Sequence, residues 1–184
     1  TNPTISTTSI IGNTASQWGG GMSCIWASSK LTNVLIAENN SDYGGGGFQS
    51  STGNQIFINV SIINNTSSLG LGGGVYSYVE TNITMLNSII WGNSTQVTFD
   101  SQCEGSCTLV ANYSDIQGGW EGVGNIDADP IFADTSNADY HLQWDSPCID
   151  TGDPASSIDL DGTIADMGAF YFDQSIVDNV TAVS

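Results

Sequence analysis

Short runs of β-branched residues, each followed by an asparagine, recur along the first half of the chain. Polar or small residues precede every run, and the closing Asn residues are spaced by 26, 26 and 28 positions. A weaker fifth copy, NYSDIQG, follows at 112–118. Such self-similarity at a fixed period is the signature of a repeat architecture. The four clear copies are TTSIIGN (7–13), NVLIAEN (33–39), NVSIINN (59–65) and NSIIWGN (87–93).

A period of about 26 residues restricts the possible architectures. It is too short for a propeller blade, and the two-helix pattern of helical repeats is missing. Leucine-rich repeats have this length but need Leu at fixed offsets, where this chain has Ile and Val. Short β-branched segments indicate strands, and one period can hold three of them with their turns. The sequence therefore predicts an all-β fold, a right-handed parallel β-helix whose coils stack about 4.8 Å apart.

The repeated residues have structural roles in such a coil. The inward-facing members of the Ile, Leu and Val runs fill the core, and the glycine runs between them allow tight corners. The recurring asparagines are expected at one corner in left-handed backbone geometry, with their amides bonded into a ladder along the stack. Ligand binding is the alternative role for these side chains. The residues are Asn13, Asn39, Asn65 and Asn93.

The repeat pattern also divides the chain. From Thr95 onward the regularity fades, as expected of a cap that closes the open end of a stack. We therefore expect coils over 1–118, a C-terminal cap of the same domain over 119–173, and a linker or tail over 174–184.

The charge is strongly negative, with one Lys, no Arg and a formal net charge of −18. Nucleic acid is excluded as a partner because phosphate contacts need basic residues. Anionic membranes and polyuronate chains are repelled for the same reason. No run of 18 apolar residues exists, so we expect no direct membrane span. The acidity is typical of a soluble extracellular domain, and binding of divalent cations is the alternative reading.

Four cysteines are present. Cys103 and Cys107 enclose the short loop CEGSC and are expected to form a local disulfide in an oxidising compartment. A zinc site at this pair is disfavoured because no second Cys/His pair accompanies it. Cys24 and Cys148 lie far apart in the sequence, and we expect each to be a buried free thiol.

The second half carries a distinctive phrase, built from GNIDADPIFAD, DYHLQWDSPCIDTGD and DLDGTIADMGAF. It closely resembles the end of bacterial choice-of-anchor domain proteins of type Q, within the wider group of right-handed β-helix surface proteins. The resemblance covers nearly the whole chain, because the upstream SIIxN and GGG repeats match the same group. It implies a β-helix fold and a bacterial protein that is secreted or displayed on the cell surface. The usual Arg after the D..G element is replaced here by Thr163–Ile164–Ala165.

Parallel β-helices often host polysaccharide lyases and hydrolases, so a catalytic function is one alternative. A lyase needs a base and charge neutralisation, and this chain offers only Lys30 and His141. Strand alternation places His141 opposite Tyr140 and Leu142, which favours a structural role. Neither Gly-His-Gly nor Arg-x-Lys occurs. We therefore assign no catalytic residue and lean against an enzyme.

Two groups of side chains are candidates for binding. Trp18 and Tyr43 occupy similar positions in successive repeats and form a candidate strip for stacking sugar rings; turn packing is the alternative. The second group resembles half of an oxygen-rich calcium loop, although ordinary turns in which Asp accepts backbone N–H groups are the favoured explanation. These metal candidates are Asp150, Asp153, Asp159, Asp161 and Asp166.

Three functions follow as hypotheses. The first is a non-catalytic extracellular module for adhesion, glycan binding or scaffolding, with glycans or other surface proteins as partners. The second is a fragment of a polysaccharide lyase or hydrolase. The third is a self-assembling filament subunit, because the end coil of a solenoid presents an open strand edge.

Overall fold

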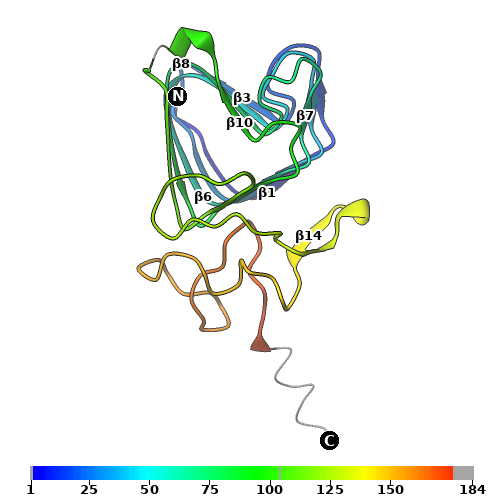
Figure 1. The fold of residues 1–184 in the computed structure, drawn as a ribbon, viewed down its shortest axis with the longest axis vertical. Coiled ribbons are helices and arrows are strands. Elements are labelled where there is room, and N and C mark those ends of the chain that lie inside the picture. The colour runs from blue at the N-terminus through cyan, green and yellow to red at the C-terminus, as the bar shows by residue number, and fades with distance from the viewer. Residues whose placement is uncertain (1, 104, 176–184) are drawn as a thin grey trace, which may run out of the picture.

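Parallel strands stack along one axis in the computed structural model, which describes residues 2–103 and 105–175 (Figure 1). A nine-stranded sheet forms two walls of the stack, and a three-stranded sheet forms a lobe. The large sheet contains β1 (Thr4–Ile11), β3 (Met22–Ile25), β4 (Lys30–Ala37), β6 (Phe48–Ile63), β8 (Val75–Leu86), β9 (Ile89–Trp91), β10 (Val97–Phe99), β11 (Thr108–Asn112) and β12 (Asp115–Ile116). The lobe contains β2 (Thr14–Ala15), β5 (Asn40–Ser41) and β7 (Thr66–Ser67).

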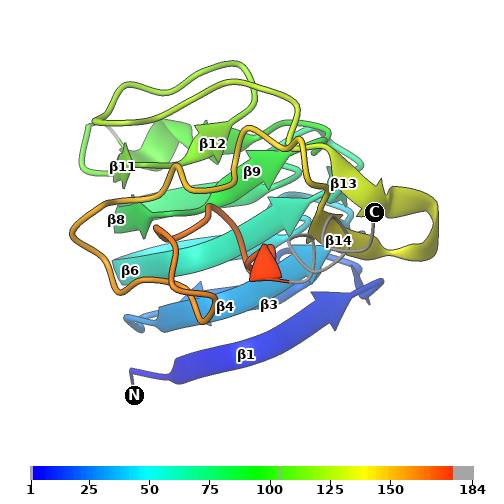
Figure 2. The same ribbon diagram turned by 90° about the horizontal axis from the view of Figure 1, so that it is seen from below.

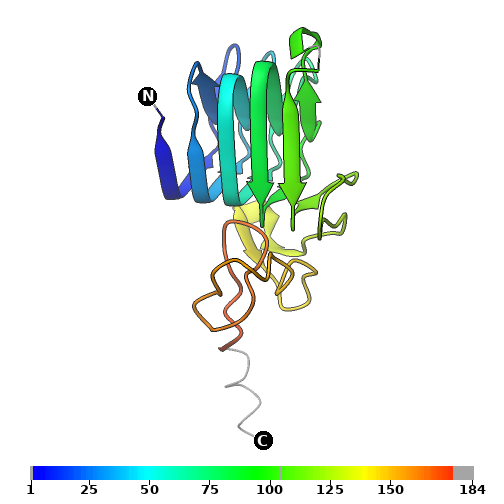
Figure 3. The same ribbon diagram turned by 90° about the vertical axis from the view of Figure 1, so that its left-hand side faces the viewer.

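The strand register repeats the sequence period. Thr8 pairs with Val34, and Val34 pairs with Val60, so equivalent residues of successive coils lie side by side. All pairings among β1–β12 are parallel. The predicted fold class is confirmed: the chain is a parallel β-solenoid with turns of about 26 residues between residues 4 and 116. Figure 3 shows these strands side by side.

Each Ile-rich run supplies both faces of its strand. Ile36, Ile62 and Ile90 lie in the main core together with Phe48 and Phe57, whose rings meet edge to face at 5.0 Å. Their neighbours in sequence lie on the outer face because successive side chains of a strand alternate. These outer residues are nevertheless buried, since the C-terminal region covers them; they are Leu35, Ala37, Ile63 and Ile89.

The four asparagines form a continuous ladder of hydrogen bonds. The amide Nδ2 of each donates to Oδ1 of the next, at 3.0 Å, for the pairs Asn13–Asn39, Asn39–Asn65 and Asn65–Asn93. The same Oδ1 atoms accept the backbone N–H of the preceding ladder residue at 2.9 Å. Asn39 and Asn65 are fully buried.

The expected left-handed backbone falls one residue earlier than predicted. Positive φ angles occur at the residue before each ladder asparagine, namely Gly12 (69°), Glu38 (57°), Asn64 (54°) and Gly92 (67°). The preceding residue therefore turns the corner. The ladder residue itself is free to aim its amide along the stack and at the carbonyl oxygen of an Ile in the neighbouring coil, 2.9 Å away for Asn39 and Ile10.

The glycine runs are required because some of their residues have positive φ angles and others leave no room for a Cβ atom. Gly45 has φ 64°, in the left-handed region that favours glycine. A Cβ on Gly46 would lie 2.0 Å from the carbonyl oxygen of Thr66 in the next coil. The lobe can therefore pack against the β3–β6 wall only because these positions carry no side chain.

The C-terminal region has two parts with different locations. Residues 119–128 add a partial rung at the end of the stack, where Ile126 pairs in parallel with Asp115 and Trp120 packs against the core. Residues 130–173 instead lie along the side of the coils, in front of β4, β6 and β8 in Figure 2. They include β13 (Phe132–Asp134), η2 (Thr135–Asn137) and β14 (Asp139–Leu142).

The expected cap over 119–173 thus closes the stack with its first residues only. The reason is the outer apolar column of Leu35, Ile63 and Ile89. Tyr140, Met167 and Ala169 pack against this column on the side of the solenoid, because the contact removes apolar surface from water. The predicted tail at 174–184 lies outside the described residues from position 176 onward. Within the described part of the chain, no helix is long and apolar enough to cross a membrane.

Candidate functional site

Two aromatic side chains are exposed where the lobe turns back toward β3 and β6. Trp18 precedes β3 and Tyr43 precedes β6, and their ring centroids lie 5.4 Å apart with planes inclined at 34°. Trp18 is 37% exposed and Tyr43 is 44% exposed. The structure therefore brings the two predicted ligand-binding residues together on the surface, across two coils.

Tyr76 of β8 lies beneath this pair. Its ring stacks on Trp18 with a centroid distance of 4.8 Å and an interplanar angle of 19°. Its hydroxyl donates to a carboxylate oxygen of Asp100. Burial and the Asp100 carboxylate raise the pKa of Tyr76, and the same hydroxyl lowers the pKa of Asp100. Tyr76 thus fixes the position of Trp18 from below.

Polar groups continue the site along the outer face of the β3–β6–β8 wall. Ser23, Gln49 and Tyr76 stand in one register column. The Ser23 hydroxyl donates to Oε1 of Gln49 at 2.6 Å. We refer to Trp18, Tyr43, Tyr76, Gln49 and Ser23 as the aromatic face. Trp18, Tyr43 and Ser23 are its exposed members, whereas Gln49 and Tyr76 are buried beneath them. Exposed ring faces beside a hydroxyl group suit a polyhydroxylated ligand, because sugar rings stack through their apolar faces and hydrogen-bond through their edges.

Sequence reasoning missed Tyr76 and Gln49. Alternation along VYSYV (75–79) was the available signal, because it directs Tyr76 to the outer face when Val75 lies inside. The stacking on Trp18, by contrast, depends on how far the indole reaches across the neighbouring coil.

The five aspartates of the metal hypothesis are spread through turns of the C-terminal region. Asp166 is buried and accepts the backbone N–H of Asp150 at 2.7 Å and that of Phe172 at 2.6 Å. Asp159 accepts the backbone N–H of Asp166 at 2.8 Å. Burial raises the pKa of Asp166 to about 6. These carboxylates hold the chain's own turns in place.

The remaining three aspartates also bond to the chain's own groups, and Oδ2 of Asp150 accepts the side-chain amide of Gln174 at 2.8 Å. Asp161 accepts the backbone N–H groups of Thr163 and Gln174, which lower its pKa, and Asp153 accepts that of Ala155. Among the described residues, no group of three or more His, Cys, Asp or Glu side chains is placed to hold a metal ion. The structure therefore places Asp150, Asp159, Asp161 and Asp166 near one another but does not arrange their carboxylates as a metal site.

A carboxylate and a thiol are buried together where the last coil meets the C-terminal region. Asp115 of β12 is fully buried and accepts the backbone N–H of Ala128 at 3.2 Å. Cys148 is a buried free thiol beside it, and Cys24 is the other one. Burial raises the pKa of Asp115 to about 6 and also raises that of Cys148.

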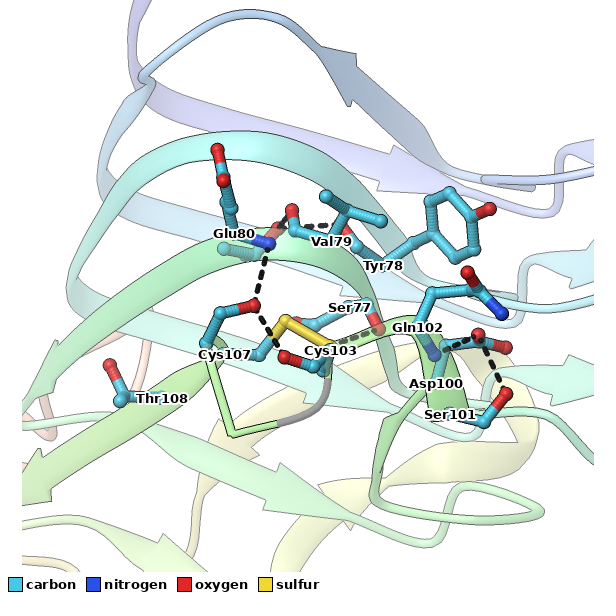
Figure 4. The surroundings of a disulfide bond; sticks show 12 residues. Ser77, Tyr78, Val79, Glu80, Asp100, Ser101, Gln102, Cys103, Cys107 and Thr108 are labelled. Atoms are coloured by element: carbon cyan, nitrogen blue, oxygen red, sulfur yellow. Dashed lines mark hydrogen bonds between the residues drawn. A yellow bond between two sulfur atoms is a disulfide. The ribbon is translucent and has the colours of Figure 1, made fainter.

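Cys103 and Cys107 are joined by a disulfide, with their Cα atoms 5.2 Å apart (Figure 4). The bridge closes the loop that follows η1 (Ser101–Cys103). This loop is held to β8 by the backbone N–H of Glu80, which donates to Oγ of Ser106 at 3.3 Å.

The two residues considered for base catalysis lie apart. Lys30 is exposed at the start of β4. His141 is exposed between the buried residues Tyr140 and Leu142, its Nδ1 is 2.7 Å from Oδ1 of Asp139, and its ring stacks on Phe170 at 4.3 Å.

These features define the class of protein as a parallel β-solenoid of about four turns, with a C-terminal region packed along its side and an exposed aromatic face. A scan against protein-family models, a search of curated proteins and a search of solved structures each give no match to this chain.

Proposed function

We propose that this chain is a non-catalytic extracellular module that binds carbohydrate through its aromatic face. The observation that carries the proposal is the pairing of Trp18 and Tyr43, two exposed aromatic rings that do not belong to the hydrophobic core. Tyr76 supports them from beneath, so the platform is preorganised and little conformational entropy is lost on binding.

The charge of the chain defines the class of glycan. With one Lys and nineteen acidic residues, the chain repels uronate and sulfated chains. Asp100 beside Tyr76 adds negative charge next to the platform. A neutral glycan is therefore the ligand that the aromatic face suits best.

We also propose that the chain is a secreted or surface-displayed bacterial protein of the choice-of-anchor type Q group. The support is the phrase that ends in SPCIDTGD and DMGAF, together with the solenoid fold. The disulfide between Cys103 and Cys107 is in keeping with an oxidising compartment outside the cytoplasm.

An array of neutral, amino and acidic glycans tests this function, followed by titration of the best ligand against single variants. Trp18→Ala and Tyr43→Ala are each expected to weaken binding by about tenfold or more, the loss of one stacking contact. Trp144→Ala is the matched control, because Trp144 is 75% exposed in the C-terminal region. Depolymerisation of any polysaccharide, or binding that survives both platform variants, contradicts the proposal.

A further inference from the structure

The side of the solenoid already hydrogen-bonds to polypeptide backbone, namely the turns of the chain's own C-terminal region. Oδ1 of Asn87 accepts the backbone N–H of Asp153 at 2.8 Å, and Oγ of Ser61 accepts that of Ala169 at 2.9 Å. Nδ2 of Asn59 donates to the backbone carbonyl of Asp166 at 3.5 Å. Side-chain amides and hydroxyls of the third and fourth coils therefore recognise a passing backbone.

The column of Asn87 and Asn59 continues onto the first two coils as Asn33 and Thr7, whose side chains make no hydrogen bond to the described C-terminal residues. Asn33 is the equivalent of Asn59, and Thr7 is the equivalent of Asn33, because their neighbours in sequence pair directly. Both are exposed, and Asn33 has no side-chain hydrogen bond among the described residues. Together with Ser9 and Thr32 they form the floor of a cavity of about 790 Å³.

Apolar side chains of the C-terminal region form the opposite wall of this cavity. Leu160 is 90% exposed, Ile158 is 66% exposed, and Phe170 is held by its stacking on His141. Neighbouring large aliphatic groups left in water are typical of an interaction site. The cavity therefore combines a floor that recognises polypeptide backbone with a wall that recognises apolar side chains.

Charge distinguishes among the possible occupants. Asp159 lies in the wall, and neither Lys nor Arg lines the cavity. The chain as a whole has a formal net charge of −18, so a cationic partner is attracted and an acidic one is repelled.

We propose that this cavity, called here the flank groove, binds an extended segment of a partner protein that alternates apolar and basic side chains. The segment's backbone lies on Asn33 and Thr7, as the chain's own backbone lies on their equivalents Asn87 and Asn59. Its apolar side chains pack against Leu160 and Ile158, and its basic side chains face Asp159 and solvent. The groove continues an interface that the chain itself demonstrates, and it is independent of the aromatic face.

Fluorescence anisotropy with labelled peptides of about ten residues, the length of an extended segment bound by strand addition, provides the test. The probe alternates Val and Lys, and a matched control alternates Ser and Lys, so that both carry the same charge. We expect the Val–Lys peptide to bind about tenfold more tightly at physiological salt. The double variant Asn33→Ala/Leu160→Ser is expected to abolish that difference.

Both substituted side chains are exposed, and circular dichroism verifies that the variant keeps its fold, because Asn33 has φ 55° and Ala is strained there. Val123→Ser, at a position that is 64% exposed near the end of the stack, is the control for a lost surface apolar group. Trp18→Ala leaves peptide binding unchanged if the two sites are separate. Equal binding of the two peptides overturns the proposal, as does a full effect in Val123→Ser or displacement of the probe by a neutral glycan.

Discussion

Cys148 donates its thiol hydrogen to the carboxylate of Asp115, with 3.3 Å between Sγ and Oδ2, although the two residues are 33 positions apart. Both side chains are fully buried. The pair joins the last coil to the C-terminal region in an apolar setting, and burial of this kind favours the protonated carboxyl group.

The stability of the protein is therefore expected to depend on pH in an unusual direction. The pKa of Asp115 is raised to about 6 in the folded state, above its value in the unfolded chain. The folded state then binds the proton more tightly, so the stabilising contribution is complete below pH 4 and is lost as the pH rises through 6. Asp166 acts in the same sense. The free energy of unfolding at pH 5 should exceed that at pH 7.5 by roughly 1.4 kcal/mol per group, because only about half of the full effect of about 3 kcal/mol is present at pH 5, as measured by urea denaturation.

Asp115→Asn isolates this effect. The variant keeps an acceptor for Ala128 but no longer ionises, so it should be more stable than the wild type at pH 7.5, and this advantage should decrease as the pH is lowered to 5. Asp145→Asn, at an exposed carboxylate, controls for the lower net charge. Measurements stay above pH 5, because Asp134, Asp139 and Asp161 have lowered pKa values and titrate in the opposite sense in stronger acid. Stability that increases toward pH 7.5 would refute the assignment.

The asparagine ladder is expected to be strongest at its centre. Asn65→Ala removes the acceptor of the buried Asn39 backbone N–H and a donor to the carbonyl of Ile36. The lost hydrogen bonds cost roughly 3 kcal/mol of unfolding free energy in total. Asn13→Ala, at the exposed end, should cost about 1 kcal/mol or less. Urea denaturation of the two variants distinguishes a ladder from a set of equivalent side chains, for which the losses would be equal.

Substitutions at two glycines distinguish the cost of a steric clash from the cost of an unfavourable backbone angle. Gly46→Ala places a Cβ 2.0 Å from the Thr66 carbonyl oxygen, so a coil must move and we expect a loss of about 3 kcal/mol or failure to fold. Gly70 has φ 73° with no atom within 4 Å of the added Cβ, so Gly70→Ala should cost only about 1–2 kcal/mol. Thermal melts of both variants test this order, and a reversed order would contradict the close packing of lobe and wall.

Calcium is expected to leave the melting temperature unchanged. Ca²⁺ requires six to eight oxygen ligands, whereas the oxygens of Asp161 and Asp166 are already engaged by backbone N–H groups. Melts in Ca²⁺ and in excess chelator, with Mg²⁺ as the control cation, provide the measurement. A rise specific to Ca²⁺ that disappears in Asp161→Asn would instead establish the metal site that the sequence suggested.

The sequence was sufficient for the features that repeat and insufficient for those that occur once. Period, strand content and the ladder of Asn13 to Asn93 follow from local pattern. The position of the C-terminal region does not follow from local pattern. Adjacent apolar residues such as Ile62 and Ile63 indicate that both faces of the strand are buried, but they do not indicate which segment covers the outer face. The contact between Trp18 and Tyr76 similarly joins different coils, and no local pattern encodes it.

The outer apolar column has a consequence for the order in which the protein is made. Ser61 and Ala169, which meet through a hydrogen bond, are 108 residues apart, so the outer face of the early coils is uncovered until the last part of the chain has been synthesised. During that interval, Leu35, Ile63 and Ile89 form an adhesive strip open to other nascent chains. The C-terminal region buries this strip once it has been synthesised, so the rate of translation between Ser61 and Ala169 sets how long the strip stays exposed.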